Sequence, residues 1–114
     1  MKSIWTNSCI LKRWENLNRE IETEIAVIGG GITGILTAYL LQREGRRAVV
    51  LERYFIGSGQ TQNTTAKITS QHGLCYAGLI KKYGIEKARQ YGFANEEARK
   101  EYERLIEKEQ IACD

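Results

Sequence analysis

The sequence has no proline, a single histidine and three cysteines in 114 residues. The absence of proline leaves no obvious linker. The cysteines, Cys9, Cys75 and Cys113, lie far apart with neither CxxC nor another metal-ligand spacing, so we expect reduced thiols and no metal site. No HExxH motif, Ser/His/Asp order or carboxylate pair marks a catalytic centre, and the sequence leaves the catalytic residues unknown.

Long apolar runs and a strong charge imbalance are also missing. No run approaches the length of a membrane-spanning helix, and the start of the chain lacks the apolar core of a signal peptide. The formal net charge is +3, and no basic stripe with interleaved aromatic residues points to nucleic acid. We therefore expect a cytoplasmic protein that binds neither membranes nor nucleic acids. Its length allows one small domain at most.

What the sequence does contain is a glycine-rich turn between an apolar run and a helical pattern. The run at residues 25–28 leads into glycines at the spacing GxGxxG, namely Gly29, Gly31 and Gly34. Gly29 permits a tight turn, Gly31 permits close approach of a pyrophosphate, and Gly34 lets the helix pack close to the sheet. The N–H groups at the helix start, those of Ile32 and Thr33 included, would face the phosphates.

A second apolar run, at residues 48–51, ends in an acidic residue. Glu52 follows Gly29 by 23 residues, the place where a carboxylate accepts hydrogen bonds from ribose hydroxyls. Its charge disfavours NADP, because it would repel a 2′-phosphate. The pattern predicts an α/β fold, an incomplete Rossmann-like βαβ unit for FAD or NAD(P) followed by helices. A nucleotide-binding P-loop is excluded, because no Lys-Ser/Thr pair follows the glycines.

Composition divides residues 1–114 into four segments. We expect an extended or loosely helical arm at 1–23, which carries Trp5 and Trp14, and the βαβ fingerprint at 24–53. The helix of the fingerprint is predicted at 32–44, ended by Gly45, with an apolar side formed by Ile35, Leu36, Tyr39 and Leu40. A polar loop at 54–73 follows, and then helices at 74–110 that are interrupted at Gly84.

The last helix, predicted at 85–110, has residues of one face at spacings of three and four: Ala88, Tyr91, Asn95, Ala98, Tyr102 and Leu105. Glu96–Lys100 and Arg99–Glu103 are expected ion pairs on its other faces. Asn95 interrupts the apolar stripe. Its side chain either satisfies a buried loop, which we favour, or contacts a ligand.

Three segments together resemble FAD-dependent oxidoreductases of the D-amino-acid-oxidase and glycine-oxidase superfamily. They are the turn at 27–34 (Val-Ile-Gly-Gly-Gly-Ile-Thr-Gly), the strand end at 51–53 (Leu-Glu-Arg) and the segment at 64–73 (Thr-Thr-Ala-Lys-Ile-Thr-Ser-Gln-His-Gly). The last segment is similar to a bacterial branch whose full-length members also carry a C-terminal Rieske iron–sulfur domain. The resemblance covers nearly the whole chain, from Trp5 to Asp114.

The resemblance implies FAD in an extended form, with its pyrophosphate at the glycine turn and its adenosine ribose at Glu52. The loop at 57–67 would pass the pyrophosphate and approach the flavin. The cofactor-binding residues implied are Gly29, Gly31, Ile32, Thr33, Gly34, Glu52, Arg53, Thr64, Thr65 and Lys67. In this family the flavin takes a hydride from the carbon beside an amine nitrogen, so the implied substrate of the full-length enzyme is a small amine or amino acid.

The chain also departs from the family, whose members are longer and carry a substrate-binding sheet domain. One histidine cannot supply the two that a Rieske cluster needs. We therefore expect the N-terminal, truncated part of a flavoenzyme, inactive alone. Two strands and three helices form a thin core with open strand edges, so we expect a marginal fold unless the chain forms a homo-oligomer or pairs with the missing part.

Two other functions stay open from the residues alone. The βαβ unit would serve equally in an NAD-binding Rossmann module, and a non-catalytic fragment that self-associates would bind nothing. A polar loop and helices after Glu52, in place of a third parallel strand, favour the flavin family. His72 is either a structural histidine at a helix boundary or a flavin contact or attachment point. Lys67 either holds negative charge near the flavin or pyrophosphate or lies on a helix surface.

Overall fold

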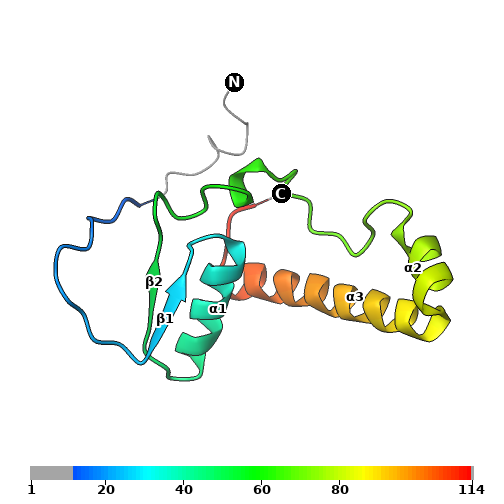
Figure 1. Ribbon diagram of the computed structural model, residues 1–114, viewed down its shortest axis with the longest axis horizontal. Helices are drawn as coiled ribbons and strands as arrows, with labels where there is room; N and C mark the ends of the chain where they lie inside the picture. The colour runs from blue at the N-terminus through cyan, green and yellow to red at the C-terminus, as the bar shows by residue number, and fades with distance from the viewer. Residues whose placement is uncertain (1–11, 114) are drawn as a thin grey trace. The chain divides into compact units, whose positions relative to one another are not determined.

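The structure, a computed structural model, describes residues 12–113. The expectations for Cys9 and Trp5 lie outside the described residues. The chain divides into two compact units, residues 1–66 and residues 67–114, and each is described by itself. The order of elements is β1, α1, β2 and a short 3-10 turn η2 in the first unit, then α2 and α3 in the second (Figure 1).

The first unit is built on a βαβ unit, as the sequence predicts. Strand β1 (Ile25–Ile28) pairs in parallel with β2 (Ala48–Leu51), with Ile25 opposite Ala48 and Ile28 opposite Leu51. The start of the pair is fixed by the carboxylate of Glu24, which accepts a hydrogen bond from Arg46 at 2.6 Å. Because the strands are parallel, their carboxyl ends meet at one edge, which places the glycine turn beside Glu52. The fold is thus an α/β, incomplete Rossmann-like unit followed by helices.

Helix α1 (Ile32–Arg43) connects the two strands and packs on both of them. Its packed side differs from the predicted one, because Ile35 and Leu40 are exposed while Leu36 and Tyr39 are half-buried. Gly45 ends the helix as predicted. It has a φ of +73°, its N–H donates to the Gln42 carbonyl at 3.0 Å, and the N–H of Arg46 donates to the Leu41 carbonyl at 2.9 Å. This paired arrangement is a Schellman motif, which glycine favours.

The arm and the loop of the first unit are irregular. Residues 12–23 form neither helix nor strand, so the loosely helical form of the predicted arm is not found in the described part, and its extended form stays a prediction. The Trp14 side chain is 66% exposed, with the Lys12 ammonium 4.2 Å from the ring centroid. After β2 the chain forms a loop that contains η2 (Thr61–Asn63).

The second unit is a helical hairpin. Helix α2 (Cys75–Tyr83) and helix α3 (Ile85–Lys108) pack on each other and are joined at Gly84, whose φ of +83° permits the sharp reversal (Figure 1). Arg99 pairs with Glu103 as predicted. Glu96 pairs with Arg99 at 2.8 Å, while its expected partner Lys100 lies 3.9 Å from Glu97.

Burial is shallow throughout the described residues. Ala88, which is 4% exposed, is the one buried apolar side chain among them, which confirms the thin core expected from the sequence. The Asn95 amide donates to the Tyr91 carbonyl of its own helix at 2.8 Å, so the expectation that it satisfies a buried loop was wrong. Among the described helices, none is both long and apolar enough to cross a membrane.

Candidate functional site

The turn between β1 and α1 has the geometry that its glycines predict. Gly29 has a φ of +100°, a conformation that L side chains rarely adopt, and its N–H donates to the Leu51 carbonyl at 2.8 Å. A Cβ at Gly34 would lie 1.9 Å from the Gly29 carbonyl oxygen, so glycine is required for this close approach of helix and turn. The structural roles predicted for Gly29 and Gly34 are therefore confirmed.

Gly31 has an ordinary extended backbone, with a φ of −77° and a ψ of −178°. A Cβ at this position would lie 3.1 Å from the Thr61 hydroxyl oxygen. The chain itself therefore supplies one reason for a small residue here. The predicted approach of a pyrophosphate to Gly31 stays a prediction.

Glu52 lies at the end of β2 and is bonded to the turn itself. One carboxylate oxygen accepts the N–H of Gly30 at 2.7 Å and the other accepts the N–H of Tyr54 at 2.8 Å. These backbone donors, that of Tyr54 foremost, hold the pKa of Glu52 below its ordinary value of 4.5, so the side chain is an anion at neutral pH. Each carboxylate oxygen has two acceptor positions, so the side chain keeps the capacity to accept a further hydrogen bond.

Part of the loop after β2 is hydrogen-bonded to the same turn. The hydroxyl oxygen of Thr61 accepts the N–H of Ile32 at 3.0 Å, and the N–H of Gly57 donates to the Gly30 carbonyl at 2.7 Å. A Cβ at Gly30 would lie 2.5 Å from Cδ1 of Ile56. The sequence reasoning missed the roles of Gly30, Ile56 and Thr61. The dense polar loop was a signal that this region is ordered, but its contacts with the turn have no local pattern.

The start of α1 keeps several unpaired donors. The N–H groups of Gly31, Thr33 and Gly34 reach no protein acceptor within the part of the chain that the structure describes. No acidic side chain lies in the first turn of the helix. Free N–H groups and the positive end of the helix dipole favour an anion at this place. The arrangement can bind a phosphate group of a nucleotide.

The remaining candidate residues are Arg53, Thr64, Thr65 and Lys67. Arg53 follows Glu52 with its guanidinium 5.8 Å from the Tyr54 ring centroid. Thr64 bonds locally, since its hydroxyl donates to the Thr61 carbonyl and accepts the N–H of Ala66, both at 3.2 Å, and Thr65 is exposed beside it. Lys67 belongs to the second unit.

Lys67 and His72 both lie in the irregular segment before α2 and are exposed. The possibility that Lys67 lies on a helix surface was therefore wrong. Cys75 and Cys113 are free thiols, as expected. Within residues 12–113 no group of three or more histidine, cysteine or acidic side chains is placed to hold a metal ion.

Comparison with known proteins agrees with this geometry. Residues 24–114 match the family model described as FAD dependent oxidoreductase. The chain is 37% identical over 113 residues to YhfW of Bacillus subtilis (strain 168), whose name describes a Rieske 2Fe-2S iron-sulfur protein. It is 31% identical over 101 residues to the gamma-glutamylputrescine oxidoreductase of Escherichia coli (strain K12).

These alignments cover 99% and 89% of this chain but 22% and 24% of the two relatives, so the chain spans about a quarter of their length. No solved structure gave a significant match. The family model covers most of the chain, including the glycine turn, Glu52 and both helices of the second unit. The chain therefore belongs to the family of FAD-dependent oxidoreductases.

Proposed function

We propose that this chain provides the dinucleotide-binding part of an oxidoreductase that oxidises an amine or amino acid by hydride transfer to FAD. The observation that carries the proposal is the meeting of two groups at one sheet edge: unpaired N–H donors at the start of α1 and the Glu52 carboxylate, 2.7 Å from the Gly30 nitrogen. The donors suit a pyrophosphate and the carboxylate suits ribose hydroxyls. The residues thus fit the adenosine diphosphate half of FAD.

The parts of the site would act in different ways. Gly31, Thr33 and Gly34 would donate backbone hydrogen bonds to phosphate oxygens, and Glu52 would orient the ribose. Thr61 keeps the loop against the turn through its bond to Ile32, so the donors stay in place before the ligand arrives. Bound FAD would supply the chemistry of hydride acceptance from the carbon beside an amine nitrogen. Ile32, Arg53, Thr64, Thr65 and Lys67 complete the proposed contacts to FAD.

The residues after β2 support FAD over NAD. An NAD-binding Rossmann half would continue to a third parallel strand, whereas the described chain continues through η2 into the helices α2 and α3. One relative is named as an oxidoreductase of gamma-glutamylputrescine, which is an amine, and this name supports an amine as the substrate class. A cytoplasmic location, a homo-oligomer and inactivity of the 114 residues alone stay predictions.

Calorimetric titration with FAD, ADP and NAD tests the proposal. We expect FAD and ADP to bind the wild-type chain and Gly31→Val to abolish this binding, because the added side chain would take the pyrophosphate position. Gly78→Ala is the matched control, since a Cβ at Gly78 meets no atom within 4 Å. Retained affinity in a folded Gly31→Val protein would contradict the site. Preference for NAD over FAD would favour the Rossmann module, and no binding of any of the three would favour the non-catalytic fragment.

A further inference from the structure

Residues 67–73, which we call the strap, precede α2 and carry Lys67 and His72. The strap has no helix or strand, yet it is fixed at its middle. The phenolic O–H of Tyr76 in α2 donates to the Ser70 carbonyl at 2.6 Å. A turn beside this bond is closed by the Thr69 hydroxyl, whose oxygen accepts the N–H of Gln71 at 3.0 Å. An irregular exposed segment is thus bonded to the helical hairpin through one side chain.

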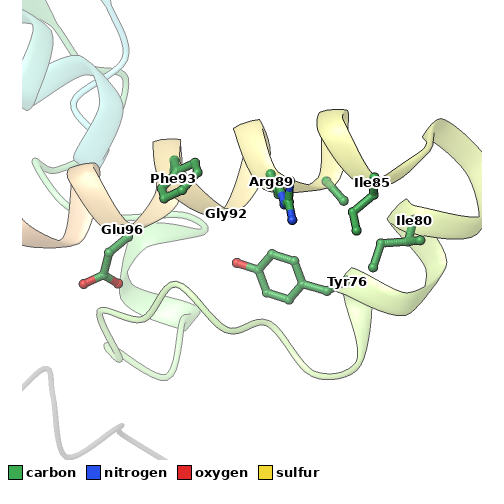
Figure 2. Close-up of a pocket in the computed structure, with 8 residues that line it drawn as sticks. Tyr76, Ile80, Ile85, Arg89, Gly92, Phe93 and Glu96 are labelled. Carbon is green, nitrogen blue, oxygen red and sulfur yellow. The ribbon is translucent and has the colours of Figure 1, made fainter.

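The Tyr76 ring reaches the strap because α3 leaves room for it. A Cβ at Gly92 would lie 3.2 Å from Cε1 of Tyr76 and 3.7 Å from its hydroxyl oxygen. The ring of Tyr91 packs edge-on to the Tyr76 ring, with 6.0 Å between centroids. The two helices border a pocket lined by Tyr76, Ile80, Ile85, Ala88, Arg89, Gly92, Phe93 and Glu96. Figure 2 shows the Tyr76 ring lying along α3 with its hydroxyl directed toward the Glu96 end of this pocket. Glycine in the middle of a helix is unfavourable, and the close passage of this ring gives a packing reason for it.

Glu96 lies one helical turn after Gly92. Its carboxylate accepts hydrogen bonds from Arg99, at 3.0 Å from Nε and 2.8 Å from Nη2. Arg99 foremost, and then Ser70, lower the pKa of Glu96. The hydrogen bond that holds the strap is therefore the one from Tyr76 in α2 to the Ser70 carbonyl.

We propose that Tyr76, with the room that Gly92 leaves for its ring, is a positioning residue that fixes the strap, and with it Lys67, through Ser70. The part of this inference that concerns the ligand rests on the proposed function, in which Lys67 contacts FAD. The fixing of the strap is a property of the second unit alone. Neither Tyr76 nor Gly92 is itself a proposed contact to the cofactor, so each acts through the strap.

Limited trypsin digestion of the full 114-residue chain tests the fixing of the strap, because trypsin cleaves after the exposed Lys67. Tyr76→Phe keeps the ring and removes the bond to Ser70. We expect this variant to raise the rate of cleavage after Lys67 by about three- to tenfold, the effect of losing one hydrogen bond from a locally opening segment. Cleavage after Lys81 and Lys87, within the helices, should stay at the wild-type rate.

Tyr83→Phe is the matched control, since it removes a phenol from the same helix. The Tyr83 hydroxyl bonds no residue in the described part of the chain. In Tyr83→Phe the strap should be cleaved after Lys67 at the wild-type rate. Unchanged cleavage after Lys67 in Tyr76→Phe would overturn the proposal. An equal rise at Lys81 and Lys87 would do the same, because it would show general loosening of the hairpin.

Titration of the same variants with FAD and ADP separates the two inferences. If Lys67 contacts the part of FAD beyond ADP, then Tyr76→Phe should weaken the binding of FAD and leave the binding of ADP unchanged. Lys67→Met should weaken FAD in the same way. Faster cleavage with unchanged FAD affinity would leave the strap fixed by Ser70 and contradict the role of Lys67 in the proposed function.

Discussion

Removing the charge of Glu52 should sharply reduce the preference of the chain for ligands that carry the ribose hydroxyls. In the structure the two carboxylate oxygens each accept one backbone N–H, from Gly30 and from Tyr54, and the carboxylate keeps the capacity to accept a further hydrogen bond. Glu52→Gln replaces one carboxylate oxygen by an amide nitrogen, which can accept neither a backbone N–H nor a ribose hydroxyl. The substitution therefore removes one ribose acceptor and weakens the order of the turn at the same time.

A comparison of two ligands separates these effects. We would titrate the wild-type chain and Glu52→Gln with ADP and with an ADP analogue that lacks both ribose hydroxyls. The wild-type chain should bind ADP about ten- to a hundredfold more tightly than the analogue, the effect of hydrogen bonds to a charged acceptor. In Glu52→Gln the preference should fall to about threefold or less, while any loss from a disordered turn weakens both ligands equally.

The pH dependence of the preference for ADP is a second test of the role of the Glu52 carboxylate. Because backbone N–H groups lower its pKa in the folded chain, the stabilisation that it provides is complete above its ordinary value of 4.5. It is lost as the pH falls through the lowered pKa. The preference for ADP should therefore persist at pH 5. An equally large preference in Glu52→Gln would refute the assignment of Glu52 to the ribose.

Three further predictions concern the elements around the site. Gly34→Ala should destabilise the first unit by about 1–3 kcal/mol in urea unfolding, because its Cβ would lie 1.9 Å from the Gly29 carbonyl oxygen, and a stability equal to that of Gly78→Ala would contradict this. Thr61→Val should cost about 1 kcal/mol and speed amide exchange at Ile32, and unchanged exchange would show that the 3.0 Å bond does not form in solution. Arg99 foremost, and then Ser70, lower the pKa of Glu96 to about 2, so the stability that Glu96 gives to the hairpin should be complete above pH 4.5 and lost as the pH falls toward 2. In acid unfolding followed by circular dichroism, Glu96→Gln should lose less stability over this pH range than the wild-type chain, and identical curves would contradict the expectation.

The elements of this fold could be predicted because their signals are local. The apolar runs at 25–28 and 48–51 became the two strands, and the glycines at 29 and 45 took the positive φ values that their positions require. The long periodic segment became α3, with an end two residues before the predicted one. Each of these features depends on neighbours within a few residues, which a sequence displays directly.

The contacts that complete the site could not be predicted, because they join distant residues. The bond between Thr61 and Ile32 spans 29 residues, and that between Glu52 and Gly30 spans 22. Ser70 is held by the side chain of Tyr76, 6 residues further along the chain. The exposed positions of Ile35 and Leu40 also depend on how α1 packs, which hydrophobic spacing does not specify for a two-stranded sheet. The polar composition of the loop indicated that the loop is ordered but did not indicate which residues it contacts.

The central claim is that the turn at 29–34 and Glu52 bind the adenosine diphosphate half of FAD. Titration of the ¹⁵N-labelled chain with FAD, followed by nuclear magnetic resonance, tests it most directly. We predict the largest amide shifts at Gly31, Thr33 and Gly34, with the same residues shifted by ADP. Binding that shifts only amides of α2 and α3, and leaves the turn unchanged, would contradict the account.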